Sequence, residues 1–324
     1  MKKRARWLTS LKIWLGLVIF SLPTTSLAHV KWFAEEKNEP VRPYQLTDVP
    51  ILIWIVASLA MLSLGVFLER NLKLPQNISE KLKRLKPTVI SLATIGFGIA
   101  LLIFSFNNYI FSPNLVTVGQ FGFILLLIHA VVGLLLVLGL NVRIASLFII
   151  GLFGLSLVNF GWGAVDSLEI LGLGTYILIT GRPKWRIAES QYLANAFENY
   201  QKLALPLLRI TLGINLITLG FDEKILAPAL ALNFLNGHDW NFMAKLGMAG
   251  FTDYWFAFSA GASEILIGVF LVLGLVTRLT IIALATFLVI TLFLLGPIEL
   301  IGHLPHFAIA SILLVAGSGQ FKLK

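Results

Sequence analysis

The chain has 324 residues, of which 57% are hydrophobic and 13% are charged, with a formal net charge of +9 and no cysteine. A soluble domain cannot bury this much apolar surface, and the apolar runs are too long for barrel strands. The sequence therefore predicts an all-α, polytopic membrane helical bundle. The absence of cysteine excludes disulfides and iron–sulfur clusters held by this chain. Because the basic residues lie in short segments beside the apolar runs, we expect no nucleic-acid partner.

The N-terminus has the pattern of a signal peptide. A basic start, MKKRAR, precedes a short apolar run at residues 13–22, and the small residues Ser26 and Ala28 follow it. This pattern predicts a signal peptide over 1–28 that is cleaved after Ala28, and an uncleaved anchor is the alternative. Residues 29–50 would then form a periplasmic N-terminal segment.

Apolar runs predict spanning helices along the rest of the chain. A leading helix with its cytoplasmic linker is expected over 51–85, and basic residues in 69–86 and 181–186 place those segments inside. The N-terminus would then be periplasmic and the C-terminus cytoplasmic, in a bacterial inner membrane. The amphipathic linker 183–204 is expected on the membrane surface. The predicted spans are 51–68, 89–106, 118–140, 144–160, 168–180, 207–220, 251–275, 279–295 and 304–316.

Two stretches of the chain are near copies. GLLLVLGLNVR at 133–143 and GVFLVLGLVTR at 268–278 are identical at seven of eleven positions. They predict two parallel four-helix repeats, 86–182 and 205–324, because both stretches reach the same membrane face at their arginine. Arg143 and Arg278 are expected to anchor that inner face. Weaker matches pair 109–115 with 224–230 and 168–172 with 298–302.

These residues resemble the DoxX/DoxD-like family of four-helix membrane proteins. The likeness is carried in the second copy by Arg209-x-x-x-Gly213, by the Lys224 to Pro228 loop, and by the run from Glu264 to Arg278. The tail Gly317-Ser-Gly-Gln-Phe resembles the family's Gly-x-Gly-Arg-aromatic ending, with Gln320 in place of Arg. The first copy has no such arginine before its first helix and has His129 where the second has Glu264. The resemblance implies the fold, and some relatives are linked to quinone-dependent sulfur oxidation or to membrane oxidoreductase assemblies.

Ionisable residues inside the spans are the candidate functional residues, because charge in a bilayer is costly. Glu264 is the first of these, as a buried carboxylate that carries a proton or binds a quinone carbonyl. A structural ion pair between helices is the alternative. His129, Glu299 and His306 complete a candidate proton or quinone cluster in the outer half of the membrane. For Glu299, and for Glu169 in the other copy, the alternative is a bond to open N–H groups at a helix start.

Histidines suggest two metal sites. His303 and His306 are three residues apart near Glu299, and Pro305 predicts a helix start there; imidazole and carboxylate suit zinc, iron or manganese. Cleavage after Ala28 would make His29 the first residue, whose amine and imidazole could together chelate copper. The alternatives are interfacial histidines and a simple processing site.

The sequence favours an inner-membrane subunit of a redox system, with quinone as the expected small partner and a redox protein as the other. No nucleotide, haem or flavin motif is present, so any oxidoreductase activity would need a partner or a diffusible quinone. One alternative is a transporter for a small solute or a metal ion. The other is a non-catalytic assembly or anchoring protein that uses the extra loop 231–250.

Overall fold

The computed structural model describes residues 41–113, 115–238 and 240–323, and of residues 238, 294, 295, 297–299 and 301 only the backbone. The described part of the chain is helical and has no strand beyond isolated bridges. Its principal helices are α2 (Val49–Asn71), α3 (Gln76–Phe106), α4 (Gly119–Leu138), α5 (Val142–Phe160), α6 (Leu168–Thr180), α8 (Gln201–Gly220), α11 (Asp253–Leu273), α12 (Thr277–Leu295) and α13 (Pro297–Ala316).

The predicted all-α membrane bundle is confirmed. Within the described residues, six helical segments are long and apolar enough to cross a membrane, and one of these, Val142–Thr180, comprises α5, the 3-10 turn Gly161–Ser167 and α6. Shorter apolar helices at Thr277–Phe293 and Gly302–Ala316 belong to α12 and α13. Large apolar side chains are exposed along the outer faces of these helices, as lipid contact requires.

The helices pack in a circuit. Along the chain, α3 packs on α4, α4 on α5 and α5 on α6, and in the second half α8 packs on α11 and α12 on α13. The two halves interlock, because α6 packs along α8 and α13 packs along α3. The first helix of each half therefore lies against the fourth helix of the other half, rather than closing its own bundle.

Glycines allow the helices to cross closely. A Cβ on Gly98 would lie 2.6 Å from the carbonyl oxygen of Gly133, where α3 crosses α4. A Cβ on Gly213 would lie 2.7 Å from the carbonyl oxygen of Gly268, where α8 crosses α11. Small residues at such crossings let helix backbones approach each other in a membrane, and the same contact occurs in both halves.

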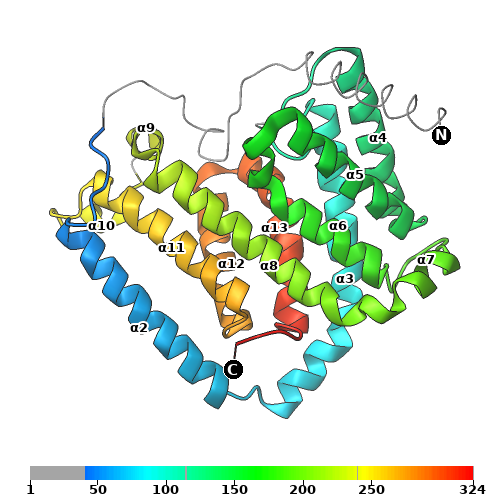
Figure 1. Ribbon diagram of the computed structural model, residues 1–324, viewed down its shortest axis with the longest axis horizontal. Coiled ribbons are helices and arrows are strands. Elements are labelled where there is room, and N and C mark those ends of the chain that lie inside the picture. Colours follow the sequence, from blue (N-terminus) through cyan, green and yellow to red (C-terminus); the bar gives the residue numbers. More distant parts are fainter. Residues whose placement is uncertain (1–40, 114, 239, 324) are drawn as a thin grey trace, which may run out of the picture.

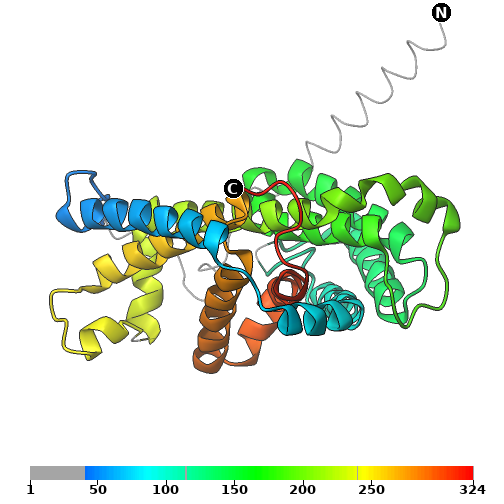
Figure 2. The same cartoon turned by 90° about the horizontal axis from the view of Figure 1, so that it is seen from below.

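Helix α2 stands at the edge of the molecule beside α11 (Figures 1 and 2). Its contacts are polar at both ends: the indole N–H of Trp54 donates to Ser259 Oγ at 2.8 Å, and Glu69 Oε2 accepts from the backbone N–H of Val276 at 2.8 Å. Before the helix, the Tyr44 hydroxyl donates to the carbonyl of Tyr254 at 2.9 Å, and burial raises the pKa of Tyr44, which keeps this donor protonated.

Three boundaries differ from the prediction. Helix α3 begins at Gln76 and not after the basic segment, because 76–86 consists mostly of good helix formers. Helix α13 begins at Pro297 and holds Pro305 in its interior, so the start predicted at Pro305 is wrong. Pro297 supplies the favoured first-turn proline instead. Residues inserted between α8 and α11 form two helices, α9 (Pro228–His238) and α10 (Phe242–Lys245), rather than an open loop.

Candidate functional site

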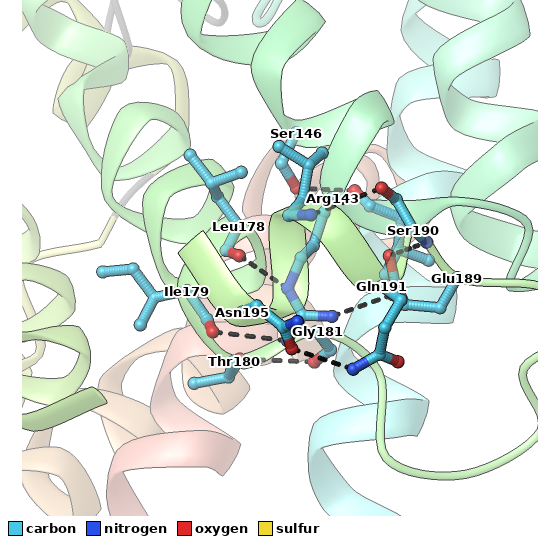
Figure 3. A network of polar contacts seen from close by, with 12 residues as sticks. Arg143, Ser146, Leu178, Ile179, Thr180, Gly181, Glu189, Ser190, Gln191 and Asn195 are labelled. Carbon is cyan, nitrogen blue, oxygen red and sulfur yellow. Dashed lines mark hydrogen bonds and ion pairs between the residues drawn. The ribbon is translucent and has the colours of Figure 1, made fainter. Parts of the chain in front are cut away.

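Two arginines bind the C-terminal carbonyls of neighbouring helices. Arg143 at the start of α5 donates from Nε to the carbonyl of Leu178 at 3.0 Å and from Nη2 to Ile179 at 3.4 Å (Figure 3). Arg278 at the start of α12 makes the same bonds to Leu314 at 2.9 Å and to Val315 at 3.4 Å. We call the end of the bundle that holds these contacts the arginine end. Arg143 is only 6% exposed, and both guanidinium groups supply donors to carbonyls at helix ends. That these arginines mark the inner membrane face stays a prediction.

The ends of α4 and α11 are capped in the same way. Arg182 Nη1 donates to the carbonyls of Leu136 and Val137, both at 2.9 Å. Arg209 Nη1 donates to Leu271 at 2.6 Å and to Val272 at 3.0 Å. Both helices then end at a glycine with a positive φ, 71° at Gly139 and 72° at Gly274, a conformation that costs glycine little.

An ion pair joins α11 to the turn that follows α8. Lys224 lies in a π-helical turn, η4 (Phe221–Ile225), and its Nζ is 2.8 Å from Glu264 Oε2. The same ammonium is 3.9 Å from Glu223 Oε2. The side chains of Lys224 and Glu264 are 12% and 15% exposed. Glu264 is therefore the partner of a lysine that sequence reasoning did not connect with it, and the pair can be reached from outside the bundle.

His129 has apolar surroundings in the first half. It is fully buried on α4, and its ring lies edge-on to Phe111 with ring centroids 5.2 Å apart. Neither ring nitrogen makes a hydrogen bond to a described residue, and the carbonyl of Leu101 is a neighbouring acceptor. Helices α4 and α11 stand on opposite sides of the circuit (Figure 1), so His129 and Glu264 do not share a site.

A second polar site lies where the two halves meet. The Asn215 amide on α8 donates from Nδ2 to the carbonyl of Asp166 at 2.7 Å, and its Oδ1 is 3.3 Å from His306 Nε2 on α13. Because Nδ2 is used on a carbonyl, Oδ1 faces the histidine and His306 Nε2 is the donor. His306 is buried, and its ring centroid is 5.2 Å from that of His303.

Glu169 belongs to this second site. It lies in the first turn of α6, three residues before Gly172. A Cβ on Gly172 would lie 2.8 Å from the Cβ of Thr211 on α8. Asn215 follows Thr211 by four residues on the antiparallel helix, so Glu169 and Asn215 lie together on the α6–α8 contact. The carboxyl is 3% exposed, its Oε2 lacks a hydrogen-bond partner among the described residues, and Asp166 is a charged neighbour.

Glu169 and Glu299, which the sequence pairs as equivalent residues of the two copies, lie at different distances from the arginine-capped ends of their helices. Gly181 and Gly317 follow α6 and α13 and both lie against the capping guanidinium groups. Glu169 precedes Gly181 by twelve residues, whereas Glu299 precedes Gly317 by eighteen. The two glutamates therefore sit at different depths, because α13 has more helical residues before its cap than α6.

The structure does not gather the four predicted cluster residues. Glu264 pairs with Lys224, His306 with Asn215, and His129 stands apart; the side chain of Glu299 is not described. His303 and His306 lie side by side, but no group of three ligating side chains in the described part of the chain could hold a metal ion. His29 and the signal peptide lie outside the described residues. Asn215 and Lys224 are the polar residues that sequence reasoning missed, although both stand inside or beside an apolar run.

The fold and these sites define a multi-pass, all-α membrane protein. Residues 204–297 match the family model of DoxX. The match runs from α8 through α12 and contains Arg209, Lys224 and Glu264. The first half of the chain lies outside it. No curated protein and no solved structure matches the chain.

Proposed function

We propose that the protein is a DoxX-like membrane subunit of a quinone-linked redox system, with Lys224 and Glu264 as its polar site. The observation that carries the proposal is the partly exposed ion pair of these two residues at a π-helical turn within the segment that matches DoxX. The π-helical turn follows the C-terminal end of α8 and carries the lysine to the side of α11. A charged pair inside a span is a functional candidate because its burial is costly.

The chemistry of the pair suits a quinone that arrives from the lipid. An ammonium group can donate to one carbonyl oxygen, and a carboxyl group can hold a proton for it. Reduction to the quinol takes up two electrons and two protons, and the electrons would come from a redox partner protein. Glu223, which is buried beside Lys224, is a second carboxyl within reach of the same ammonium.

We further propose that the chain contains two DoxX-like repeats, 86–182 and 205–324, in a bacterial inner membrane with the arginine end cytoplasmic. The matched glycine crossings and the matched arginine caps support the repeats. The orientation is supported by the exposed basic residues Lys81, Arg84 and Lys184 at the arginine end.

Quinone binding tests the proposal. Protein in lipid nanodiscs is titrated with decylubiquinone, and binding is followed by quenching of tryptophan fluorescence. Glu264→Gln removes the charge that holds Lys224 in place. We expect this variant to bind the quinone about tenfold more weakly than the unsubstituted protein does. Glu198→Gln, at an exposed glutamate near α8, is the matched control and should bind as the unsubstituted protein does. If both variants bind the quinone with the same affinity, Glu264 is not part of the quinone site. If the unsubstituted protein does not bind the quinone, the proposed function is wrong.

A transporter is the second candidate, because a polar site lies between the two halves. Asn215, His306 and Glu169 meet where α6, α8 and α13 pack together. Transporters built from repeats bind their substrates near such an interface. Uptake of a solute or a metal ion into proteoliposomes that is lost on Asn215→Leu, and kept on Glu264→Gln, would favour this function over the first.

A further inference from the structure

Basic residues from two distant parts of the chain meet at the arginine end. Lys184 follows α6, and its Nζ donates to Thr88 Oγ1 of α3 at 2.8 Å while its backbone N–H donates to Ser91 Oγ at 2.9 Å. Arg84 precedes Thr88 by four residues and Lys81 precedes Arg84 by three, so these side chains share the face of α3 on which Lys184 lies. These three cations therefore lie on one surface of the protein.

No carboxylate in the described ranges forms an ion pair with Lys81, Arg84 or Lys184. Glu80 lies four residues before Arg84 on the same face of α3, and it accepts a hydrogen bond from Gln76 at 3.3 Å rather than forming an ion pair with Arg84. Like charges held close together repel unless an anion lies between them. Three exposed cations without an ion-paired carboxylate among the described residues give this surface a positive charge that favours an anionic ligand.

The loop that holds Lys184 is fixed rather than free to move away. Arg182 Nε donates to the Lys184 carbonyl at 3.0 Å, and Ile187 N–H donates to the Gly139 carbonyl at 2.9 Å. Between them Trp185 is 55% exposed, as an aromatic ring at a membrane interface is. Such a ring favours a site at the level of lipid headgroups.

An apolar stripe continues from the basic residues along α3. Leu85, Leu92 and Ile99 follow one another at intervals of seven residues, or about two helical turns, and are 51%, 54% and 41% exposed. A ligand that fits both features has an anionic head and a long apolar tail. We propose that Arg84, Lys184 and Lys81 bind the phosphate of an anionic phospholipid whose acyl chain lies along this stripe.

Thermal unfolding in detergent tests the site independently of the proposed function. Added dioleoyl-phosphatidylglycerol should raise the Tm more than phosphatidylcholine does, and the lipid concentration for half of the shift should rise about tenfold or more in Arg84→Gln/Lys184→Gln. Lys73→Gln/Lys202→Gln removes two exposed charges at the same end and should leave the shift unchanged. Arg84→Lys/Lys184→Arg keeps the charge and should keep the shift.

Further measurements distinguish a bound phospholipid from a bound free phosphate. Glycerol phosphate and inorganic phosphate lack a tail and should not reproduce the shift; if they do, the ligand is a free phosphate and the lipid proposal is overturned. Equal shifts with both lipids, or equal losses in both glutamine pairs, would also overturn it. If Arg84→Gln/Lys184→Gln does not fold, the unsubstituted protein still decides, because raising NaCl from about 0.05 to about 0.5 M must abolish a charge-dependent lipid effect.

Discussion

Arg182 and Arg209 donate to corresponding carbonyl pairs although they come from different places in the chain. Arg182 follows α6 and caps α4, whereas Arg209 lies in α8 and caps α11. The first half has no arginine at the position of Arg209, and the loop after α6 supplies the missing guanidinium from elsewhere. The need to satisfy buried helix-end carbonyls thus explains two buried arginines that share no sequence motif.

Removing an arginine cap should destabilise the bundle. Arg143→Ala leaves the carbonyls of Leu178 and Ile179 without their donor and Glu189 without its ion pair at 3.4 Å. Hydrogen bonds from charged groups contribute about 1.5–3 kcal/mol each, so we expect a loss of at least about 2 kcal/mol in the free energy of unfolding. Arg186→Ala, at an exposed arginine in the same region, should change it by less than about 0.5 kcal/mol. Chemical denaturation in detergent measures both, and equal losses would contradict the capping role.

The glycine crossings give a second prediction. In Gly213→Ala the new methyl group would lie 2.7 Å from the Gly268 carbonyl oxygen and 2.8 Å from Val272 Cγ2, so α8 and α11 must move apart. Overpacking of this kind costs about 1–3 kcal/mol. Gly151→Ala is the control, since nothing lies within 4 Å of its Cβ and alanine favours a helix by up to about 1 kcal/mol. A lower Tm for the first and an equal or higher Tm for the second are expected, and the reverse order would refute the close crossing.

The Lys224–Glu264 pair should show coupling between its members. Lys224→Met leaves a carboxylate without its partner in an apolar setting, and Glu264→Leu leaves the ammonium with Glu223 alone. Breaking a buried pair is costly while replacing both members is often neutral. We expect the double variant to be more stable than Lys224→Met, with a smaller difference than for a fully buried pair because both side chains are partly exposed. Additive losses in a double-mutant cycle would show that the two residues act independently.

Sequence patterns predicted the helices well but not their partners. The apolar runs are helical in the structure, and the predicted span 168–180 coincides with α6 because a glycine ends it. Periodicity says which residues are apolar, however, and not which helix they meet. That α6 packs on α8 depends on the fit of Gly172 to Thr211, two residues that no motif links.

The polar residues show the same limit. Glu264 was predicted from its cost inside a span, and it does carry a charge contact. Its partner Lys224 was predicted only as part of a loop, because a π-helical turn that points a lysine at the next helix has no signal in the sequence. Asn215 was not predicted because the candidates were the ionisable residues inside the spans, and an amide carries no charge.

Crosslinking can test the interlocked arrangement of the halves, since the chain has no cysteine and every thiol is an introduced one. In Gly172→Cys/Thr211→Cys the two thiols come from α6 and α8, whose Cβ positions are 2.8 Å apart, so a mild oxidant should join them after a small separation of the helices. A protease site placed in the exposed segment 191–200 makes the product visible, because joined halves stay together on a non-reducing gel. Gly172→Cys paired with Gly151→Cys is the control, in which both thiols lie before the cleavage point and the halves separate. Separation in the first variant would mean that each half closes its own four-helix bundle, with α6 against α3.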